Sequence, residues 1–169
     1  MTIVFFLNWF HRAYANLHRI GIANLSYPAP RAAWAFFIPI LNLFQPYRIA
    51  EEIRKETEFK LRLQIPNFVG AASSNLIGFW WFFWLTSNFV NQISTRMYRR
   101  ASFAEDLLAA EKVSMVGTFL TLVAALLALN MIKKMSQDET QLRDHIRLAN
   151  ELETFGEAPT EDEEEADEF

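Results

Sequence analysis

Two long stretches without a charged side chain constrain this chain most. Residues 68–90 form a run of 23 uncharged residues, and residues 113–132 (VSMVGTFLTLVAALLALNMI) form a run of 20. A helix needs about 20 predominantly apolar residues to cross the hydrocarbon core of a bilayer. Both stretches therefore predict transmembrane helices, and the chain is predicted to be an all-α integral membrane helical bundle.

Two shorter apolar runs precede these stretches. As a helix, residues 2–10 would span about 14 Å, roughly half of a bilayer core, which predicts an N-terminal partial span or an interfacial anchor. The 13 residues 32–44 are interrupted by Pro39, and Pro46 follows them closely. A run of this length broken by proline is typical of a short, re-entrant or interfacial helix.

The charges divide the chain into three parts. We expect a helical membrane domain over residues 1–135, a polar cytosolic helix over residues 136–156 and an acidic disordered tail over residues 157–169. Ser136 and Glu139 have the spacing of a capping box, which predicts that a helix begins there. The tail carries eight acidic side chains and no basic one, so the net charge of −4 comes from the tail and the remaining chain is mildly basic.

The positions of lysine and arginine favour one topology. If the proline-broken run enters the bilayer and returns, residues 11–32, 48–67 and 133–147 share one side and carry 12 basic side chains, against 4 on the other side. If this run crosses instead, the split is 7 against 9. The positive-inside rule therefore favours a re-entrant or interfacial run and a cytoplasmic C-terminus.

Candidate polar residues recur at helical spacing near the two short runs. They are Trp9, Arg12 and Asn16 near the first run, and Pro39, Asn42 and Pro46 in and after the second. Pro39 and Pro46 lack an N–H group, so each frees a carbonyl that needs another donor in hydrocarbon, and Arg12 and Asn42 could supply it. Two interpretations stay open: a polar pocket for an ion or a headgroup, and a kinked helix satisfied by its neighbours.

These residues also carry a resemblance to a known family. The segments WFHRAYANL (residues 9–17) and WAFFIPILNLFQPY (residues 34–47) resemble the paired signatures of an uncharacterised bacterial multi-pass membrane protein family, a domain of unknown function. The Glu51–Glu52 pair and the Trp80–Trp81 pair are similar too, so the resemblance covers about residues 5–95. It implies a helical fold in the bacterial cytoplasmic (inner) membrane and no established activity. Trp34 and Glu52 join the candidate polar or helix-packing residues.

Small residues at four-residue spacing mark the expected helix contacts. The first set is Gly70, Ser74 and Gly78, and the second is Gly117, Thr121 and Ala125. Small side chains let two helices approach closely in a membrane. We therefore predict that the two long helices pack on each other or on a partner chain, and that Gly78→Ile weakens this contact.

Residues that would indicate catalysis or metal binding do not form a recognisable pattern. The chain has no cysteine, its three histidines lack ligand spacing, and phosphate-binding and hydrolase motifs are absent. The six aromatic residues 79–84 (FWWFFW) fit either bulk packing or a lipid or quinone site. We expect no catalytic residue, cofactor or metal, and no nucleic-acid partner.

Three classes of function are compatible with this sequence. The first is a non-catalytic membrane protein, a structural or accessory component that binds other membrane protein subunits or itself. The alternative is a small transporter or channel element with a polar site at Pro39, Asn42 and Gln45, although the predicted spans hold no charged residue to act as a relay. An enzyme acting on lipids or a quinone is the third.

Overall fold

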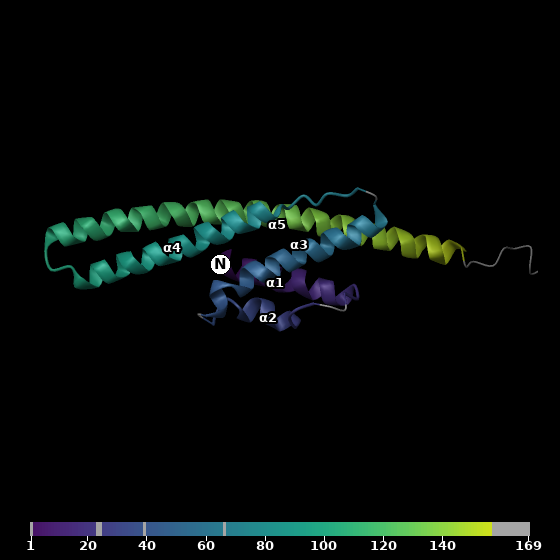
Figure 1. The fold of residues 1–169 in the computed structure, drawn as a ribbon, viewed down its shortest axis with the longest axis horizontal. Helices are drawn as coiled ribbons and strands as arrows, with labels where there is room; N and C mark the ends of the chain where they lie inside the picture. Colours follow the sequence, from purple (N-terminus) through teal and green to yellow (C-terminus); the bar gives the residue numbers. More distant parts are fainter. Residues whose placement is uncertain (1, 23–24, 39, 66, 157–169) are drawn as a thin grey trace, which may run out of the picture.

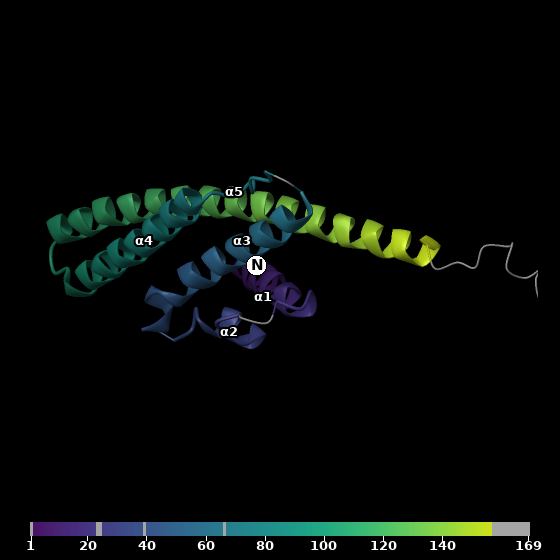
Figure 2. The same cartoon turned by 45° about the vertical axis from the view of Figure 1, so that its right-hand side comes forward.

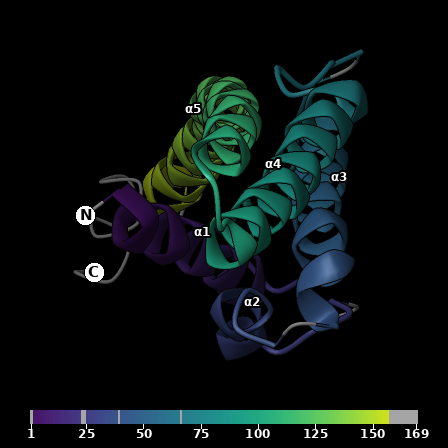
Figure 3. The ribbon, with the colours of Figure 1, turned by 90° about the vertical axis from the view of Figure 1, so that its left-hand side faces the viewer.

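The computed structural model describes residues 2–22, 25–38, 40–65 and 67–156, and within them the chain is helical and contains no strand. The elements are α1 (Thr2–Arg19), α2 (Ala29–Trp34), the 3₁₀ helix η1 (Leu41–Leu43), α3 (Gln45–Gln64), α4 (Ser74–Arg100) and α5 (Ala104–Gly156). The predicted all-α class is confirmed. Helices α4 and α5 lie side by side as a long antiparallel hairpin, and α1–α3 gather beside one end of α4 and the middle of α5 (Figures 1 and 2). Viewed along the hairpin, α1 lies between α2 and α5 (Figure 3).

Helix α1 ends in a glycine motif that turns the chain toward α2. Gly21 has a φ of 75°, a left-handed conformation that glycine adopts without steric cost. Its N–H donates to the carbonyl of His18 at 3.2 Å, and the N–H of Ile22 donates to that of Leu17 at 3.3 Å. This pairing is the Schellman motif, which satisfies the last carbonyls of the helix and stops it.

The second apolar run is mostly non-helical. Helix α2 ends at Trp34, before most of the apolar run, and residues 35–38 and 40–44 form turns, a bend and the short helix η1. The predicted proline-broken helix is therefore wrong for the larger part of this run. Pro39 lies outside the described residues. Pro46 does not break a helix, because it occupies the first turn of α3, where no partner for its nitrogen is needed.

The first predicted transmembrane stretch begins later than expected. Residues 67–73 form a loop, and the Ser73 Oγ accepts a hydrogen bond from the Leu76 N–H at 3.3 Å, which caps the start of α4. Gly70 thus lies in a loop and is not part of a helical stripe. The charge-free part of α4 is residues 74–95, where serine, asparagine and glutamine dilute the apolar character.

Of the described helices, only α5 is long and apolar enough to cross a membrane by length and composition. This gives weak support for a membrane location, and the second span expected from the sequence is not established by this criterion. The reason is the composition of α4, whose tryptophan and amide side chains are much less apolar than the aliphatic residues of α5.

Helix α5 runs unbroken for 53 residues. It starts where the Asp106 carboxylate accepts hydrogen bonds from the N–H groups of Ser102 and Phe103, both at 3.2 Å. The helix start predicted at Ser136 is wrong, because residues inside a continuous helix have intrahelical backbone partners and need no cap. The side chains of Ser136 and Glu139 are therefore free for other partners.

A seam of buried residues at seven-residue spacing joins α4 and α5. The buried residues at this spacing are Ala110, Gly117, Ala124, Met131 and Asp138 on α5, and Trp80, Ser87 and Ser94 on α4. This is the repeat of helices that wind around each other. The Ser94 Oγ donates to the Ala110 carbonyl at 3.2 Å, and a Cβ atom on Gly117 would lie 2.1 Å from the Asn91 Oδ1.

The expected stripes of small residues do not all lie in this seam. Thr121 lies at its edge, where its Oγ1 accepts a hydrogen bond from the Asn91 Nδ2 at 3.4 Å. Ala125 is exposed, and a Cβ atom on Gly78 would meet no other atom within 4 Å. Antiparallel packing with a seven-residue repeat selects Ala124 rather than Ala125 as the contact residue.

The tryptophan-rich start of α4 packs against α1 and the loop after α2. The Phe6 and Trp80 ring centroids are 5.8 Å apart, those of Phe10 and Phe36 are 5.4 Å apart, and those of Phe36 and Trp84 are 6.3 Å apart. Trp80 is only 2% exposed. Of the two interpretations of the aromatic cluster, these contacts favour packing.

Candidate functional site

Polar side chains from α1, α3 and the second half of α5 hold the helices together at the base of the hairpin. We call this set the polar junction: Trp9, Tyr14, Asn16, Glu52, Ser136, Asp138 and Glu139. It contains three of the candidate residues from the sequence. Its members come from distant parts of the chain, so only the fold brings them together.

Two hydrogen bonds connect α1 with α5. The Trp9 Nε1 donates to the Ser136 Oγ at 3.1 Å, and the Asn16 Nδ2 donates to the Glu139 Oε1. Trp9 and Asn16 are seven residues apart and therefore share one face of α1. The bonds position this face along α5 just beyond its charge-free stretch.

The Glu52 carboxylate connects α1 and the loop after it with α3. One oxygen accepts from the Tyr14 hydroxyl at 2.8 Å, and the other accepts from the Ser26 N–H at 2.7 Å. The Tyr14 oxygen in turn accepts from the Tyr27 N–H at 3.0 Å. Burial of Tyr14, together with its bond to the Glu52 carboxylate, raises the pKa of the phenol above its usual value. Tyr14 thus stays protonated as a donor.

Asp138 connects α5 with the loop that precedes α4. Its carboxylate is buried and accepts from the Ala71 N–H at 3.0 Å through either oxygen. A Cβ atom on Gly70 would lie 3.2 Å from the Asp138 Oδ2, so the absence of a side chain at Gly70 gives the carboxylate room. This contact joins the start of one hairpin helix to the other.

A row of alternating charges follows the inner face of α3. Arg54 forms ion pairs with Glu51 at 3.2 Å and with Glu58 at 2.6 Å, and Arg62 also pairs with Glu58. Glu51 Oε1 and Arg54 Nε are buried and have no hydrogen-bond partner among the described residues. Most charges in this row neutralise one another at one-turn spacing, which stabilises α3 and leaves no isolated buried charge.

The comparison with known families identifies the chain. The family described as "Domain of unknown function (DUF4328)" matches residues 1–137. The chain belongs to this family. The predicted resemblance to a family of unknown function is confirmed, over a longer range than residues 5–95. No curated protein and no solved structure matched the chain.

The DUF4328 match covers α1 to α4 and the hairpin part of α5. It contains most of the polar junction, including Trp9, Tyr14, Asn16 and Glu52. Asp138 and Glu139 lie immediately after the matched residues. The hydrogen bonds that join α1 and the loop before α4 to α5 therefore reach residues on both sides of position 137, where the DUF4328 match ends.

The candidate residues of the first signature do not all meet at one place. Arg12 is exposed, whereas Asn16 bonds to Glu139 and Trp9 to Ser136. Trp34 is 63% exposed at the end of α2, away from the junction. Trp9, Arg12 and Asn16 share a helix, but only Trp9 and Asn16 point toward α5.

The residues of the second signature make hydrogen bonds in and around the loop before α3. The Asn42 N–H donates to the Ile38 carbonyl at 2.8 Å, while the Asn42 Oδ1 is buried without a partner among the described residues. With its amide oxygen turned toward Arg31, the buried Gln45 accepts from the Arg31 Nη2 at 3.0 Å. The Trp81 Nε1 donates to the Leu43 carbonyl at 3.3 Å and ties this loop to α4.

Sequence reasoning missed four members of the polar junction as site residues: Tyr14, Asp138, and also Ser136 and Glu139, whose spacing predicts a helix cap. Tyr14 lies inside the first signature, on the side of α1 opposite to that of the chosen residues. Asp138 extends the seven-residue repeat of buried positions on α5, and an acidic residue in that repeat signals a buried carboxylate with a dedicated donor. That repeat was readable in the sequence as Ala110, Gly117, Ala124 and Met131.

The polar junction joins helices and loops through hydrogen bonds between side chains of different elements. Its carboxylates accept hydrogen bonds from fixed donors. Across residues 2–22, 25–38, 40–65 and 67–156, no group of three or more His, Cys, Asp or Glu side chains is arranged to hold a metal ion.

Proposed function

We propose that this chain is a non-catalytic integral membrane protein of the bacterial cytoplasmic membrane, in which α4 and α5 cross the bilayer as a hairpin. Helices α1–α3 and the second half of α5 form a helical unit on the cytoplasmic side. The protein would act as a structural or accessory component that binds other membrane proteins or a second copy of itself.

The observation that carries this proposal is the alignment of two charge-free segments. Residues 74–95 of α4 and residues 113–132 of α5 run side by side, and each would be about 30 Å long, the thickness of a bilayer core. Only 17% of the most apolar part of α5 is buried in the structure. Large apolar side chains point outward from both helices: Phe79, Phe82, Phe89, Met115, Phe119, Leu122, Leu126 and Leu129.

An exposed apolar surface of this extent is not stable in water, but lipid covers it at no cost. The segment between α2 and α3 also supports contact with lipid. Trp34, Phe37, Ile40 and Phe44 are each more than 60% exposed there, and the Trp81 bond to Leu43 holds the loop beside the early turns of α4. These side chains would enter the lipid interface next to the hairpin, as an interfacial segment that does not cross.

The basic residues support the orientation. The Ser26 N–H contacts the Glu52 carboxylate, so the segments around residues 25 and 52 lie on one side of any membrane that the hairpin crosses. This arrangement matches the split of 12 basic residues against 4, which favours a cytoplasmic helical unit.

The accessory role is supported by small residues on the outer surface of α4. Ser74 is exposed, and Gly78 has open space where a side chain would be. Neither residue lies in the seam with α5, so both are free to contact another membrane helix, for which small residues are well suited.

Affinity purification in a mild detergent tests this function. We expect a stoichiometric membrane protein partner, or a second copy, to be recovered with the wild-type chain, and we expect Gly78→Ile to reduce that recovery severalfold. Ala125→Ile, on the exposed face of α5, is the matched control and should leave recovery unchanged. Recovery of the chain alone as a monomer, or equal recovery with both variants, would contradict the accessory role.

A further inference from the structure

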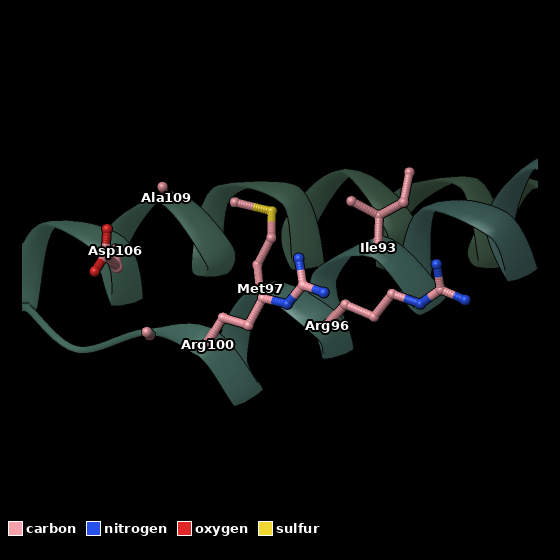
Figure 4. Close-up of a pocket in the computed structure, with 7 residues that line it drawn as sticks. Ile93, Arg96, Met97, Arg100, Asp106 and Ala109 are labelled. Atoms are coloured by element: carbon pink, nitrogen blue, oxygen red, sulfur yellow. The ribbon is translucent and has the colours of Figure 1, made fainter.

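A cavity of about 400 Å³ lies at the closed end of the hairpin, far from the polar junction. Helix α4 contributes Ile93, Arg96, Met97 and Arg100 to its lining, and Ala101, Asp106 and Ala109 complete it (Figure 4). It combines two guanidinium groups with apolar side chains. None of its lining residues belongs to the polar junction.

The two arginines leave their charge available to a ligand. Arg96 and Arg100 are one turn apart, so they share one face of α4. Within the described part of the chain, neither forms an ion pair with an acidic side chain. In Figure 4 both side chains extend away from Asp106.

Asp106 brings one negative charge to the lining, so two guanidinium groups and one carboxylate leave the cavity with a net positive charge. Its Oδ2 accepts from the N–H groups of Ser102 and Phe103, so its role is to cap α5. The cavity therefore offers two guanidinium groups with free donors beside Ile93 and Met97. Guanidinium groups match the oxygens of a phosphate in geometry and charge, and apolar walls suit an attached acyl chain.

The position along α4 determines which phosphate compounds reach the cavity. Residues 74–95 carry no charge, and Arg96 is the first charged residue after them, about 33 Å from the start of the helix. In the proposed membrane hairpin, this places both guanidinium groups at the depth of lipid headgroups. Phe103 and Leu108, both exposed at the same end, extend the apolar surface around the cavity.

We infer that Arg96 and Arg100 form a binding site for a phosphate-bearing anion, such as the headgroup of an anionic phospholipid. This inference rests on the proposed membrane hairpin. Bound lipid would anchor the closed end of the hairpin at the membrane face opposite the helical unit.

Native mass spectrometry of the full chain in detergent tests the site. Dioleoylphosphatidylglycerol is the anionic probe, and dioleoylphosphatidylcholine is the zwitterionic one. We expect the Arg96→Gln/Arg100→Gln double variant to bind phosphatidylglycerol at least tenfold more weakly than wild type, because each arginine near an anionic headgroup contributes about a fivefold gain and the two gains multiply. Binding of phosphatidylcholine should change little.

The matched control is Arg143→Gln/Arg147→Gln, which removes two arginines at the same spacing from the polar half of α5. Equal phosphatidylglycerol binding by the two double variants would overturn the inference. If millimolar inorganic phosphate displaces phosphatidylglycerol from wild type, the site is supported and accepts the free anion as well. Extraction of membranes with alkaline carbonate separates the two proposals: a double variant that stays in the membrane but loses lipid still supports the hairpin.

Discussion

Tyr14 is a buried tyrosine whose hydroxyl has two hydrogen-bond partners. Its hydroxyl donates to Glu52 and accepts from Tyr27, and its side chain is fully buried. Tyr14→Phe keeps the ring but leaves a carboxylate oxygen and a backbone N–H without partners. We expect a loss of about 1–3 kcal/mol in the free energy of unfolding, measured by chemical denaturation in detergent.

Tyr47→Phe is the control for that measurement, because Tyr47 is half-buried and makes no hydrogen bond in the part of the chain that the structure describes. It should change the free energy of unfolding by less than about 0.5 kcal/mol. Equal effects of the two substitutions would show that the Tyr14–Glu52 bond does not stabilise the fold.

The raised pKa of Tyr14 predicts a specific dependence on alkaline pH. A tyrosine whose pKa is higher in the folded state contributes stability that is fully present below about pH 10, and this contribution is lost as the pH rises further. The absorbance of ionised tyrosine should therefore show a late component above pH 10 in wild type. That component should be smaller in Tyr14→Phe, in which the hydrogen bond to Glu111 still raises the pKa of Tyr98; a component of the same size in both proteins would contradict this account.

We expect a similar loss in the free energy of unfolding when Asp138, at the other side of the polar junction, is replaced. Asp138→Asn replaces one acceptor oxygen with a donor that faces the Ala71 N–H, so we expect a loss of about 1–3 kcal/mol in the free energy of unfolding. Asp144→Asn, at an exposed position of the same helix, removes the same charge and should have little effect. If both variants unfold alike, the buried carboxylate does not hold the loop before α4.

At the level of helices, the seam between α4 and α5 distinguishes two glycines. A side chain at Gly117 would collide with Asn91, whereas one at Gly78 would meet open space. Gly117→Leu should lower the free energy of unfolding by about 1–3 kcal/mol through overpacking, and Gly78→Leu should not lower it. Thermal unfolding followed by circular dichroism in detergent measures both. A larger loss of free energy of unfolding for Gly78→Leu than for Gly117→Leu would contradict this account, because it would place Gly78 in the contact between the two helices.

The sequence predicted the helices better than it predicted their contacts. Long uncharged runs mark where α4 and α5 lie, because this signal is local, whereas the capping pattern at Ser136 and Glu139 falls inside α5. The seven-residue seam depends on how two helices cross, so four-residue spacing selected Ala125 where the structure buries Ala124. The apolar run 32–44 predicts a helix broken by proline, because its composition does not reveal that contacts with α1 and α4 hold the segment after Trp34 in turns.

The candidate site was predicted only in part for the same reason. Trp9, Asn16 and Glu52 belong to the polar junction, but Arg12 remains exposed. The partners Ser136 and Glu139 are more than one hundred residues away from α1, and their spacing resembled a helix cap. A pattern within one segment cannot show which distant segment will satisfy its polar groups.

For the whole molecule, the central claim is that the hairpin crosses the membrane with its closed end on the side opposite the helical unit. The chain has no cysteine, so single-cysteine variants can be labelled without background. Arg19→Cys, Lys55→Cys and Ser102→Cys are suitable, because all three positions are exposed and the third lies between α4 and α5.

A membrane-impermeant maleimide applied to intact spheroplasts and to inverted membrane vesicles measures which side each position occupies. The account predicts that position 102 is labelled in spheroplasts, and that positions 19 and 55 are labelled only in inverted vesicles. Labelling of position 102 on the same side as position 55, or of positions 19 and 55 on opposite sides, would contradict it.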